Sequence, residues 1–312
     1  MKDHANIGKF QDPYVTAKGE DRAHVALENP QTLWFNTGTL CNIECENCYI
    51  LSSPTNDALV YLTADEVSDY LDQLDSRKWG VKEIAFTGGE PFMNPEMIEM
   101  AKRSLERGYE VLILTNAMLP MQRKRVKEGL LALKSYGDKL TFRISVDHWS
   151  EDLHDKERGK GSFAKTVQGM QWLRDNGFQM AVAGRTVWGE TDTDSRKGYA
   201  ELFLKYDFNI DAYNPGTTVL FPEMDEKVEV PEITTACWGI LDKSPTQVMC
   251  SNSRMVVKHK GADTPSVIAC TLLPYEPEFD MGPTLEDAER PVQLNHPHCA
   301  KFCVLGGASC SA

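Results

Sequence analysis

Short apolar segments alternate with amphipathic segments over residues 33–225 of this 312-residue chain. Six apolar segments predict strands, at 33–38, 83–88, 110–116, 140–147, 180–187 and 217–221. Between them, apolar residues at helical spacing predict helices, including 64–75, 95–107 and 162–176, and Thr63 is a suitable N-cap for the first. Strands that alternate with helices of this length form parallel βαβ units. The pattern predicts an α/β fold, either a partial (β/α)6 TIM-like barrel, which we favour, or an open parallel sheet, with the chemistry at the carboxyl ends of the strands.

The alternation stops after residue 225, which predicts a change of domain. Residues 1–32 form an N-terminal extension, which we expect to be too short for a peptide-recognition domain, and 226–234 form a linker. Residues 235–312 are rich in Cys, are interrupted by Pro and Gly, and contain a hairpin-like segment at 254–270. We predict that this tail is a small second domain held together by metal rather than by a large core.

The charge balance excludes one broad class of function. The formal net charge is −13, from 33 Lys and Arg against 46 Asp and Glu, and such a chain repels nucleic-acid phosphates. No apolar run reaches the roughly 18 residues of a membrane-spanning helix, and the polar N-terminus lacks the apolar core of a signal peptide. We therefore expect a cytoplasmic protein that binds neither nucleic acid nor membrane.

The nine cysteines form two groups. Three lie at 41–48, none follows until 237, and the other six are at 237, 250, 270, 299, 303 and 310. An odd number of cysteines in a cytoplasmic chain favours metal or cluster ligands over disulfides. The grouping predicts two separate sites.

Cys41, Cys45 and Cys48 form a CxxxCxxC loop directly after the first predicted strand. Thiolates are soft ligands that suit zinc or iron–sulfur clusters. Three ligands on one short loop predict a cluster that leaves one iron open to another molecule. From the spacing alone, a zinc site of three cysteines and a distant histidine stays open.

The segment CNIECENCY at 41–49 resembles the signature of the radical S-adenosylmethionine (radical SAM) superfamily, and the resemblance extends over about 33–225. It implies a 4Fe–4S cluster on Cys41, Cys45 and Cys48, with S-adenosylmethionine on the open iron. In this family the reduced cluster cleaves S-adenosylmethionine to a 5′-deoxyadenosyl radical, which abstracts hydrogen from the substrate. The resemblance also implies an electron donor such as flavodoxin or ferredoxin.

Further segments match the family strand by strand. The TGGEP segment at 87–91 resembles the part that meets the methionine amine, and the third, fourth and fifth strands end in matching polar residues. The resemblance assigns cofactor binding to Tyr49, Gly88, Gly89, Glu90, Pro91, Thr115, Asn116, Ser145, Asp147 and Arg185, the last for the methionine carboxylate. Two departures put contacts in doubt: Ala117 replaces the usual Gly, and NPGTTVLFPEMD at 214–225 stands where a glycine-rich segment is expected. The RGKGSF turn at 158–163 also matches, and we interpret it as structural.

The C-terminal cysteines resemble the twitch or SPASM type of auxiliary-cluster domain. A full SPASM domain uses seven cysteines for two clusters, whereas this tail has six, so one auxiliary 4Fe–4S cluster is favoured. We choose Cys250, Cys270, Cys299 and Cys303 as its ligands, with Cys310 and Cys237 as substitutes. Zinc on four cysteines remains the alternative, because spacing does not separate zinc from iron. The cluster would bind substrate or accept an electron from it.

Several other polar residues are candidates for the substrate cavity. They are His148, Glu190, Tyr213, Glu223 and Asp225, any of which could accept a proton. His296 and His298, beside Cys299, are interpreted as supporting residues rather than ligands.

Three functions compete. The first is the oxidation, rearrangement or cyclisation of a small molecule, favoured by the short N-terminal extension. The second is a maturase that modifies a peptide or protein. The third is a non-catalytic zinc-binding protein, which leaves the TGGEP segment and the strand-end matches unexplained.

Overall fold

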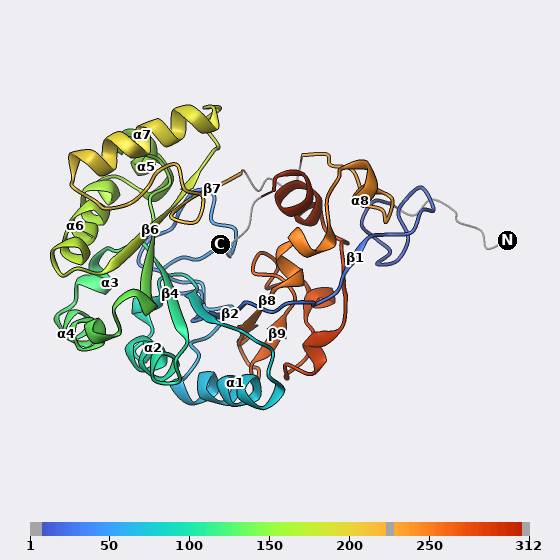
Figure 1. The fold of residues 1–312 in the computed structure, drawn as a ribbon, viewed down its shortest axis with the longest axis horizontal. Coiled ribbons are helices and arrows are strands. Elements are labelled where there is room, and N and C mark those ends of the chain that lie inside the picture. Colours follow the sequence, from blue (N-terminus) through green and yellow to red (C-terminus); the bar gives the residue numbers. More distant parts are fainter. Residues whose placement is uncertain (1–7, 223–227, 308–312) are drawn as a thin grey trace.

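The computed structural model describes residues 8–222 and 228–307, and these form a curved, mostly parallel sheet with helices on its outer face (Figure 1). All six strands predicted from the sequence are present. They are β2 (Thr32–Asn36), β3 (Glu83–Thr87), β4 (Glu110–Thr115), β5 (Leu140–Ser145), β6 (Gln179–Arg185) and β7 (Thr218–Phe221). Each pairs in parallel with the next, which gives the partial (β/α)6 barrel that the sequence predicted.

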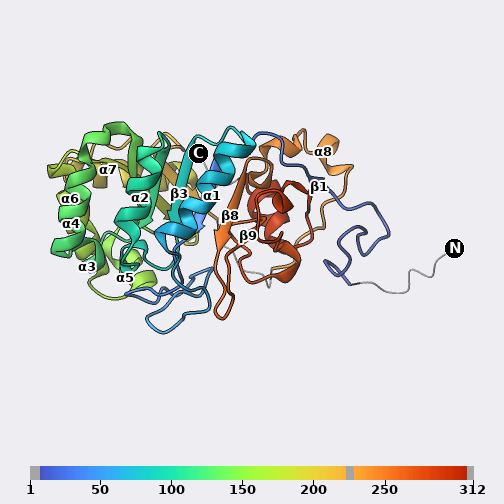
Figure 2. The same ribbon diagram turned by 90° about the horizontal axis from the view of Figure 1, so that it is seen from below.

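The helices between these strands cover the outside of the sheet (Figures 1 and 2). They are α1 (Ala64–Arg77), α2 (Met97–Glu106), α3 (Leu119–Gln122), α4 (Lys124–Leu133), α5 (Glu151–Arg158), α6 (Ser162–Asp175) and α7 (Asp192–Lys205). Thr63 caps α1 as predicted: its Oγ1 accepts from the Glu66 N–H at 3.1 Å, and Glu66 Oε2 accepts from the Thr63 N–H at 2.9 Å. This reciprocal pair is a capping box, which fixes where the helix begins.

The predicted hairpin is present and continues the main sheet. Strand β8 (Ser253–Val257) pairs in parallel with β2, and β9 (Ser266–Ile268) pairs antiparallel with β8. The strand order is therefore β7-β6-β5-β4-β3-β2-β8-β9. The Cys-rich C-terminal region thus shares a sheet with the barrel.

Short elements complete the C-terminal region. Strand β1 (His24–Val25) pairs with β10 (Val292–Gln293), so the N-terminal extension lies against the tail. Helix α8 (Cys237–Ile240) and the π-helix η7 (Cys299–Leu305) carry three of the tail's cysteines. Within the described residues, no helix is both long and apolar enough to cross a membrane.

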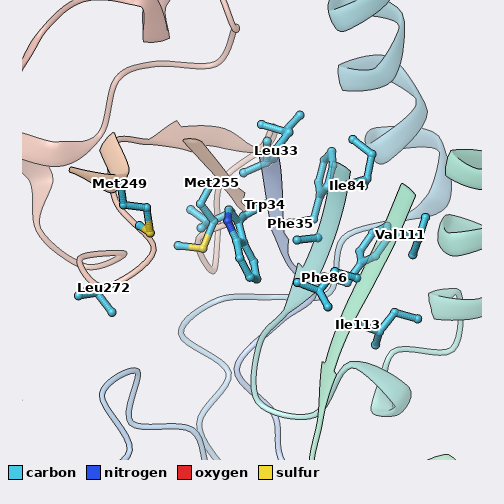
Figure 3. Close-up of a cluster of buried hydrophobic side chains, with 14 of the residues drawn as sticks. Leu33, Trp34, Phe35, Ile84, Phe86, Val111, Ile113, Met249, Met255 and Leu272 are labelled. Carbon is cyan, nitrogen blue, oxygen red and sulfur yellow. The ribbon is translucent and has the colours of Figure 1, made fainter. Parts of the chain in front are cut away.

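The core follows from the alternation of side chains along the strands. Leu33 and Phe35 of β2 pack toward the helices, and Phe35 stacks on Phe86 with ring centroids 5.7 Å apart (Figure 3). Trp34 lies between them in sequence and points to the other face, next to Met255 of β8 (Figure 3). Because successive strand residues face opposite sides, β2 supplies both the helix-covered core and the inner wall of the barrel.

Candidate active site

A cavity of about 1140 Å³, a volume that includes its open mouth, lies at the carboxyl ends of the parallel strands. It brings together most of the residues selected from the sequence. Those that line it are Cys41, Cys45, Cys48, Tyr49, Gly88, Gly89, Thr115, Asn116, Ser145, Asp147 and Arg185. The gathering follows from topology, since the carboxyl ends of parallel strands meet at one edge of a sheet.

The CxxxCxxC loop is fastened to the barrel at several points. The Cys41 N–H donates to the Ser53 carbonyl at 3.0 Å. The backbone and side-chain N–H groups of Asn47 donate to the Glu157 carboxylate at 2.9 and 2.7 Å. Arg185 Nη2 donates to the Asn47 carbonyl at 2.5 Å. The loop is therefore held by residues from the ends of α5 and β6 as well as by its own turns.

The thiols on this loop are shielded from water. Cys41 is 5% exposed, and burial raises its pKa to about 12. Burial raises the pKa of Cys45 to about 11, although the nearby Arg158 guanidinium opposes the shift. The raised pKa values mean that binding a metal at Cys41 and Cys45 must release protons.

Two glycines let the segment after β3 pack against the cysteine loop. A Cβ on Gly88, whose φ is +143°, would lie 2.6 Å from the Gly38 carbonyl oxygen, and one on Gly89 would lie 2.3 Å from the Leu40 oxygen. Such distances are below van der Waals contact, so no other residue fits either position without backbone movement. The close approach puts both glycines on the cavity wall beside Cys41.

Glu90 differs from the other predicted cofactor residues, because it is buried behind the wall. Its carboxylate accepts from Thr115 Oγ1 at 2.8 Å, from the Asn116 N–H at 2.9 Å and from the Phe92 N–H at 3.2 Å. Burial raises the pKa of Glu90 to about 7, against the opposing effect of these hydrogen bonds. Pro91, also buried, starts a short 3₁₀ turn. In this arrangement Glu90 orients Thr115 and Asn116, and its contact with the methionine amine stays a prediction.

An ion-pair network closes the side of the cavity at β5 and β6. Arg158 donates to Asp147 through Nε at 2.6 Å and Nη2 at 3.2 Å, and Arg185 Nε lies 3.8 Å from Asp147 Oδ1. Arg185 Nη1 also lies 3.5 Å from Glu157. Burial acts to raise the pKa of Asp147, but Arg158 and then Arg185 outweigh it, so the pKa lies below its usual value. Two cations and two anions thus form a nearly neutral, fixed wall.

Arg158 is the main polar residue of the site that the sequence analysis missed, because its turn was interpreted as structural. That interpretation suits the rest of the turn: the Asp155 carboxylate accepts from Gly161, Ser162 and Phe163 and so starts α6. Arg158 itself faces the cavity beside Cys41 and Cys45. Arg158 is the first residue of the RGKGSF segment, which resembles the family, and this resemblance could have identified it.

A group of apolar residues also lines the cavity. Trp34 of β2, Leu272 after β9 and the stacked pair Phe221 and Phe302 line the cavity. The two phenyl rings lie 5.7 Å apart at 29° and join β7 to the π-helix η7. These residues come from distant parts of the chain and do not belong to a recognisable motif. They could therefore not be identified from the sequence.

The remaining candidates for the substrate cavity do not line it or lie outside the described residues. Among the described residues that line the cavity, His148, Glu190 and Tyr213 do not appear. His148 is buried against Ser150 at 2.7 Å and Glu190 at 3.2 Å, and Tyr213 is 59% exposed. Glu223 and Asp225 lie outside the described residues.

A second, smaller cavity of about 360 Å³ lies among the C-terminal cysteines. Cys250, Cys270, Cys299 and Cys303 line it, which is the set chosen from the sequence, and His298 lies beside them. The hairpin brings Cys250, just before β8, next to Cys270, just after β9, and η7 carries the other two. Cys237 is not among the described residues that line this cavity. Cys310 lies outside the residues that the structure describes.

The two cavities share a wall. Leu272 lines both, and neighbours along the chain face opposite ways: Phe302 lines the larger cavity and Cys303 the smaller. All described cysteines are free thiols. At Leu272 a single side chain therefore separates the two cavities.

Comparison with known proteins agrees with this geometry. The chain is 30% identical over 191 residues to the antilisterial bacteriocin subtilosin biosynthesis protein AlbA of Bacillus subtilis, and 26% identical over 180 residues to the mycofactocin maturase MftC of Mycolicibacterium smegmatis. These matches cover 59% and 58% of this chain but only 40% and 43% of those proteins. The chain therefore spans less than half the length of these relatives.

Solved structures show the same fold. Streptococcus suis SuiB bound to S-adenosylmethionine matches with a TM-score of 0.59 at 12% identity, covering 81% of this chain and 63% of that one. The structure of anSMEcpe with bound AdoMet matches with a TM-score of 0.57 at 14% identity, covering 88% and 82%. The model of the radical SAM superfamily matches residues 35–203, more than half of the chain. The protein thus belongs to the radical SAM superfamily, whose enzymes use a 4Fe–4S cluster and S-adenosylmethionine.

Proposed function

We propose that Cys41, Cys45 and Cys48 hold the 4Fe–4S cluster and that the adjoining cavity binds S-adenosylmethionine. One observation carries this proposal: the three thiols line the same cavity as Gly88 and Gly89 and the polar strand ends. Three thiolates leave one of four irons without a protein ligand, free to hold the amine and carboxylate of S-adenosylmethionine. When bound, this pair supplies the radical that removes a hydrogen atom from the substrate.

The residues of the cavity would bind and orient S-adenosylmethionine. The exposed backbone of Gly88 and Gly89 offers close polar contacts to the methionine part, and Ser145 and Asp147 offer them to the adenosine part. Arg158 and Arg185 supply cations for the methionine carboxylate. The apolar residues Trp34, Leu272 and Phe302 of the cavity limit the access of water, which protects a radical from side reactions.

We propose that Cys250, Cys270, Cys299 and Cys303 hold one auxiliary 4Fe–4S cluster. Apart from the cysteines and His298, the residues around their cavity are apolar, such as Met249, Phe279 and Leu294, as suits a cluster kept from water. Zinc is the alternative. In the described ranges, no group of three or more His, Cys, Asp or Glu is arranged around a single ion. A 4Fe–4S cluster takes one thiolate at each of its four irons, so its thiolates lie farther apart than four ligands on one zinc ion.

We propose a peptide as the substrate. The cavity is partly open to solvent, and the curated relatives include a bacteriocin biosynthesis protein and a maturase. A structure of SuiB with precursor peptide SuiA shares the fold, at a TM-score of 0.55. This reverses the order of preference from the sequence, which favoured a small molecule.

A small molecule remains the second candidate, for one specific reason. The chain is also 28% identical over 160 residues to the AdoMet-dependent heme synthase of Methanosarcina barkeri. Oxidation of a small molecule in the same cavity would use the same residues. For either substrate we propose a flavodoxin or ferredoxin as electron donor and a cytoplasmic location, where thiols stay reduced.

The first test is anaerobic reconstitution with iron and sulfide counting, followed by a dithionite-driven assay for 5′-deoxyadenosine. We expect about eight irons per chain and 5′-deoxyadenosine from the wild type, and about four irons without product from the Cys41/Cys45/Cys48→Ala variant. Four irons in the wild type and none in the variant would remove the auxiliary cluster from the proposal. Zinc without product would refute both parts.

The substrate is tested by co-expression with any short peptide encoded beside the gene, followed by mass spectrometry of that peptide. A loss of hydrogen or a crosslink in the wild type, absent in the triple variant, would support a peptide substrate. An unchanged peptide together with conversion of a porphyrin by the purified enzyme would support the second candidate.

A further inference from the structure

Strand β8 carries an arginine with an unusual environment. Arg254 is 1% exposed, and none of the ion pairs among the described residues involves it. Its Nε donates to the Ala288 carbonyl at 3.0 Å, and its Nη1 donates to the carbonyls of Cys250 at 2.5 Å and Ser253 at 2.8 Å. Its Nη2 is buried without a hydrogen-bond partner in the described structure. The guanidinium therefore has three carbonyl partners, no carboxylate and one unused donor.

Such a charge is costly to bury without a counter-ion. Two other largely buried arginines have a carboxylate partner: Arg22 has Glu232 at 2.6 Å, and Arg158 has Asp147 at 2.6 Å. Burial lowers the pKa of Arg254 to about 10, which still leaves it protonated at neutral pH. Carbonyl dipoles offset only part of the lost hydration, so a buried cation implies a nearby anion.

The groups beside Arg254 identify that anion. The negative charges that favour its protonated form are those of the Cys250 and Cys270 thiolates, while the cation Arg290 acts in the opposite direction. Both cysteines line the smaller cavity, and Arg254 binds the carbonyl of Cys250 directly. A metal group held by these thiolates would supply the negative charge that Arg254 lacks.

We infer that Arg254 is the counter-charge of the auxiliary cluster and a positioning residue that sets its reduction potential. The inference rests on the proposed auxiliary site. A 4Fe–4S cluster on four thiolates is an anion in both oxidation states, and reduction adds one further negative charge. A fixed buried cation favours the reduced state, so it raises the potential.

The inference defines a direction for electron flow. An auxiliary cluster with a raised potential accepts an electron more readily from a substrate radical in the larger cavity. In that step the substrate radical transfers one electron to the cluster and becomes a closed-shell product. The cluster then passes the electron to the external electron-transfer protein. Arg254 therefore favours an accepting role for the auxiliary cluster.

The test is a redox titration of the auxiliary cluster, followed by electron paramagnetic resonance. The full-length Cys41/Cys45/Cys48→Ala variant is the parent, because it isolates the second site. Adding Arg254→Gln should make the cluster at least tenfold harder to reduce, a shift of about −59 mV for one electron. Adding Arg254→Lys, which keeps the charge, should keep the potential near that of the parent. Arg143→Gln, a change at an arginine that is 3% exposed on the distant strand β5, is the matched control and should not shift it.

The outcomes separate the two proposals. An iron-free parent would refute the auxiliary cluster itself. Iron in all variants with an unchanged potential in Arg254→Gln would refute only the role of Arg254. If Arg254→Gln loses its iron, the Arg254→Lys variant decides the question. Iron retained at the parent's potential supports the inference. Loss of iron, or a potential shifted by about 59 mV or more, overturns it.

Discussion

Replacing Arg158 by Met should destabilise the protein strongly, because it leaves a buried carboxylate without its partner. The Asp147 and Arg158 side chains are 5% and 13% exposed, and two hydrogen bonds join them. Breaking a buried pair on one side costs about 3–5 kcal/mol. Arg185 lies 3.8 Å from Asp147 and compensates in part, so we expect about 3 kcal/mol, the lower end of that range.

The loss should depend on pH in a defined direction. The pKa of Asp147 lies below its usual value, so in the wild type its ionised form adds stability above pH ~4, which is lost as the pH falls through the lowered pKa. Without Arg158, burial should raise that pKa instead, so ionisation costs stability at neutral pH. The difference between wild type and Arg158→Met should therefore be largest near pH 7 and shrink toward pH 4.

Urea unfolding of the metal-free, reduced protein at several pH values measures both effects. Asp147→Asn with Arg158→Met should recover part of the loss, because it removes the unpaired charge. Lys260→Met is the control: its pair with Asp57 is 63% and 48% exposed and should be worth less than about 1 kcal/mol. An Arg158→Met variant no less stable than Lys260→Met, or a loss that does not change with pH, would refute the reasoning.

Three further predictions concern the cysteine loop, a buried acid and a helix cap. Gly89→Ala should lose the iron bound by the CxxxCxxC loop, since its Cβ would lie 2.3 Å from the Leu40 oxygen. The control Gly239→Ala, with open space around its Cβ, should keep all its iron on reconstitution. Equal iron in both variants would contradict the packing argument. Burial raises the pKa of Glu90 to about 7, so wild-type stability should fall as the pH rises from about 4.3 to about 7, and Glu90→Gln should flatten this slope in urea titrations; identical slopes would mean that Glu90 is not the group responsible. Thr63→Ala should lower the unfolding free energy by about 1 kcal/mol through loss of the capping box, and a change below about 0.3 kcal/mol in the same assay would count against that cap.

The sequence predicted the barrel and the cysteine sites because their signals are local. Each strand appears as an apolar run, and each motif falls at a strand end, so the parallel topology alone brings Cys41, Gly89, Asn116 and Asp147 to one edge. The four C-terminal ligand candidates came from the resemblance to twitch or SPASM domains, in which a hairpin brings its two flanking cysteines together.

Features that depend on distant partners could not be predicted in this way. Arg158 was assigned to a turn because its partner Asp147 lies on another element, and nothing in the local pattern gives the direction of its side chain. Arg254 stands within an apolar strand, where a charged residue usually predicts an exposed position, and only the fold shows that it is buried. The pairing of β8 with β2 also lacks a local signal, because register between parallel strands is set by packing.

The pairing of β8 with β2 has a consequence for biosynthesis. It joins Thr32 to Ser253, about 220 residues later, so one edge of β2 has no neighbour until most of the chain has left the ribosome. An unpaired strand edge is a site of aggregation, and pairing so distant in sequence forms slowly. We expect nascent chains that end before residue 253 to bind holdase chaperones and full-length chains to be released from them, as pull-down of stalled ribosomes at both lengths would measure. Equal chaperone binding at both lengths would contradict this expectation. Assembly of the iron sites would then begin only after residue 253 has left the ribosome.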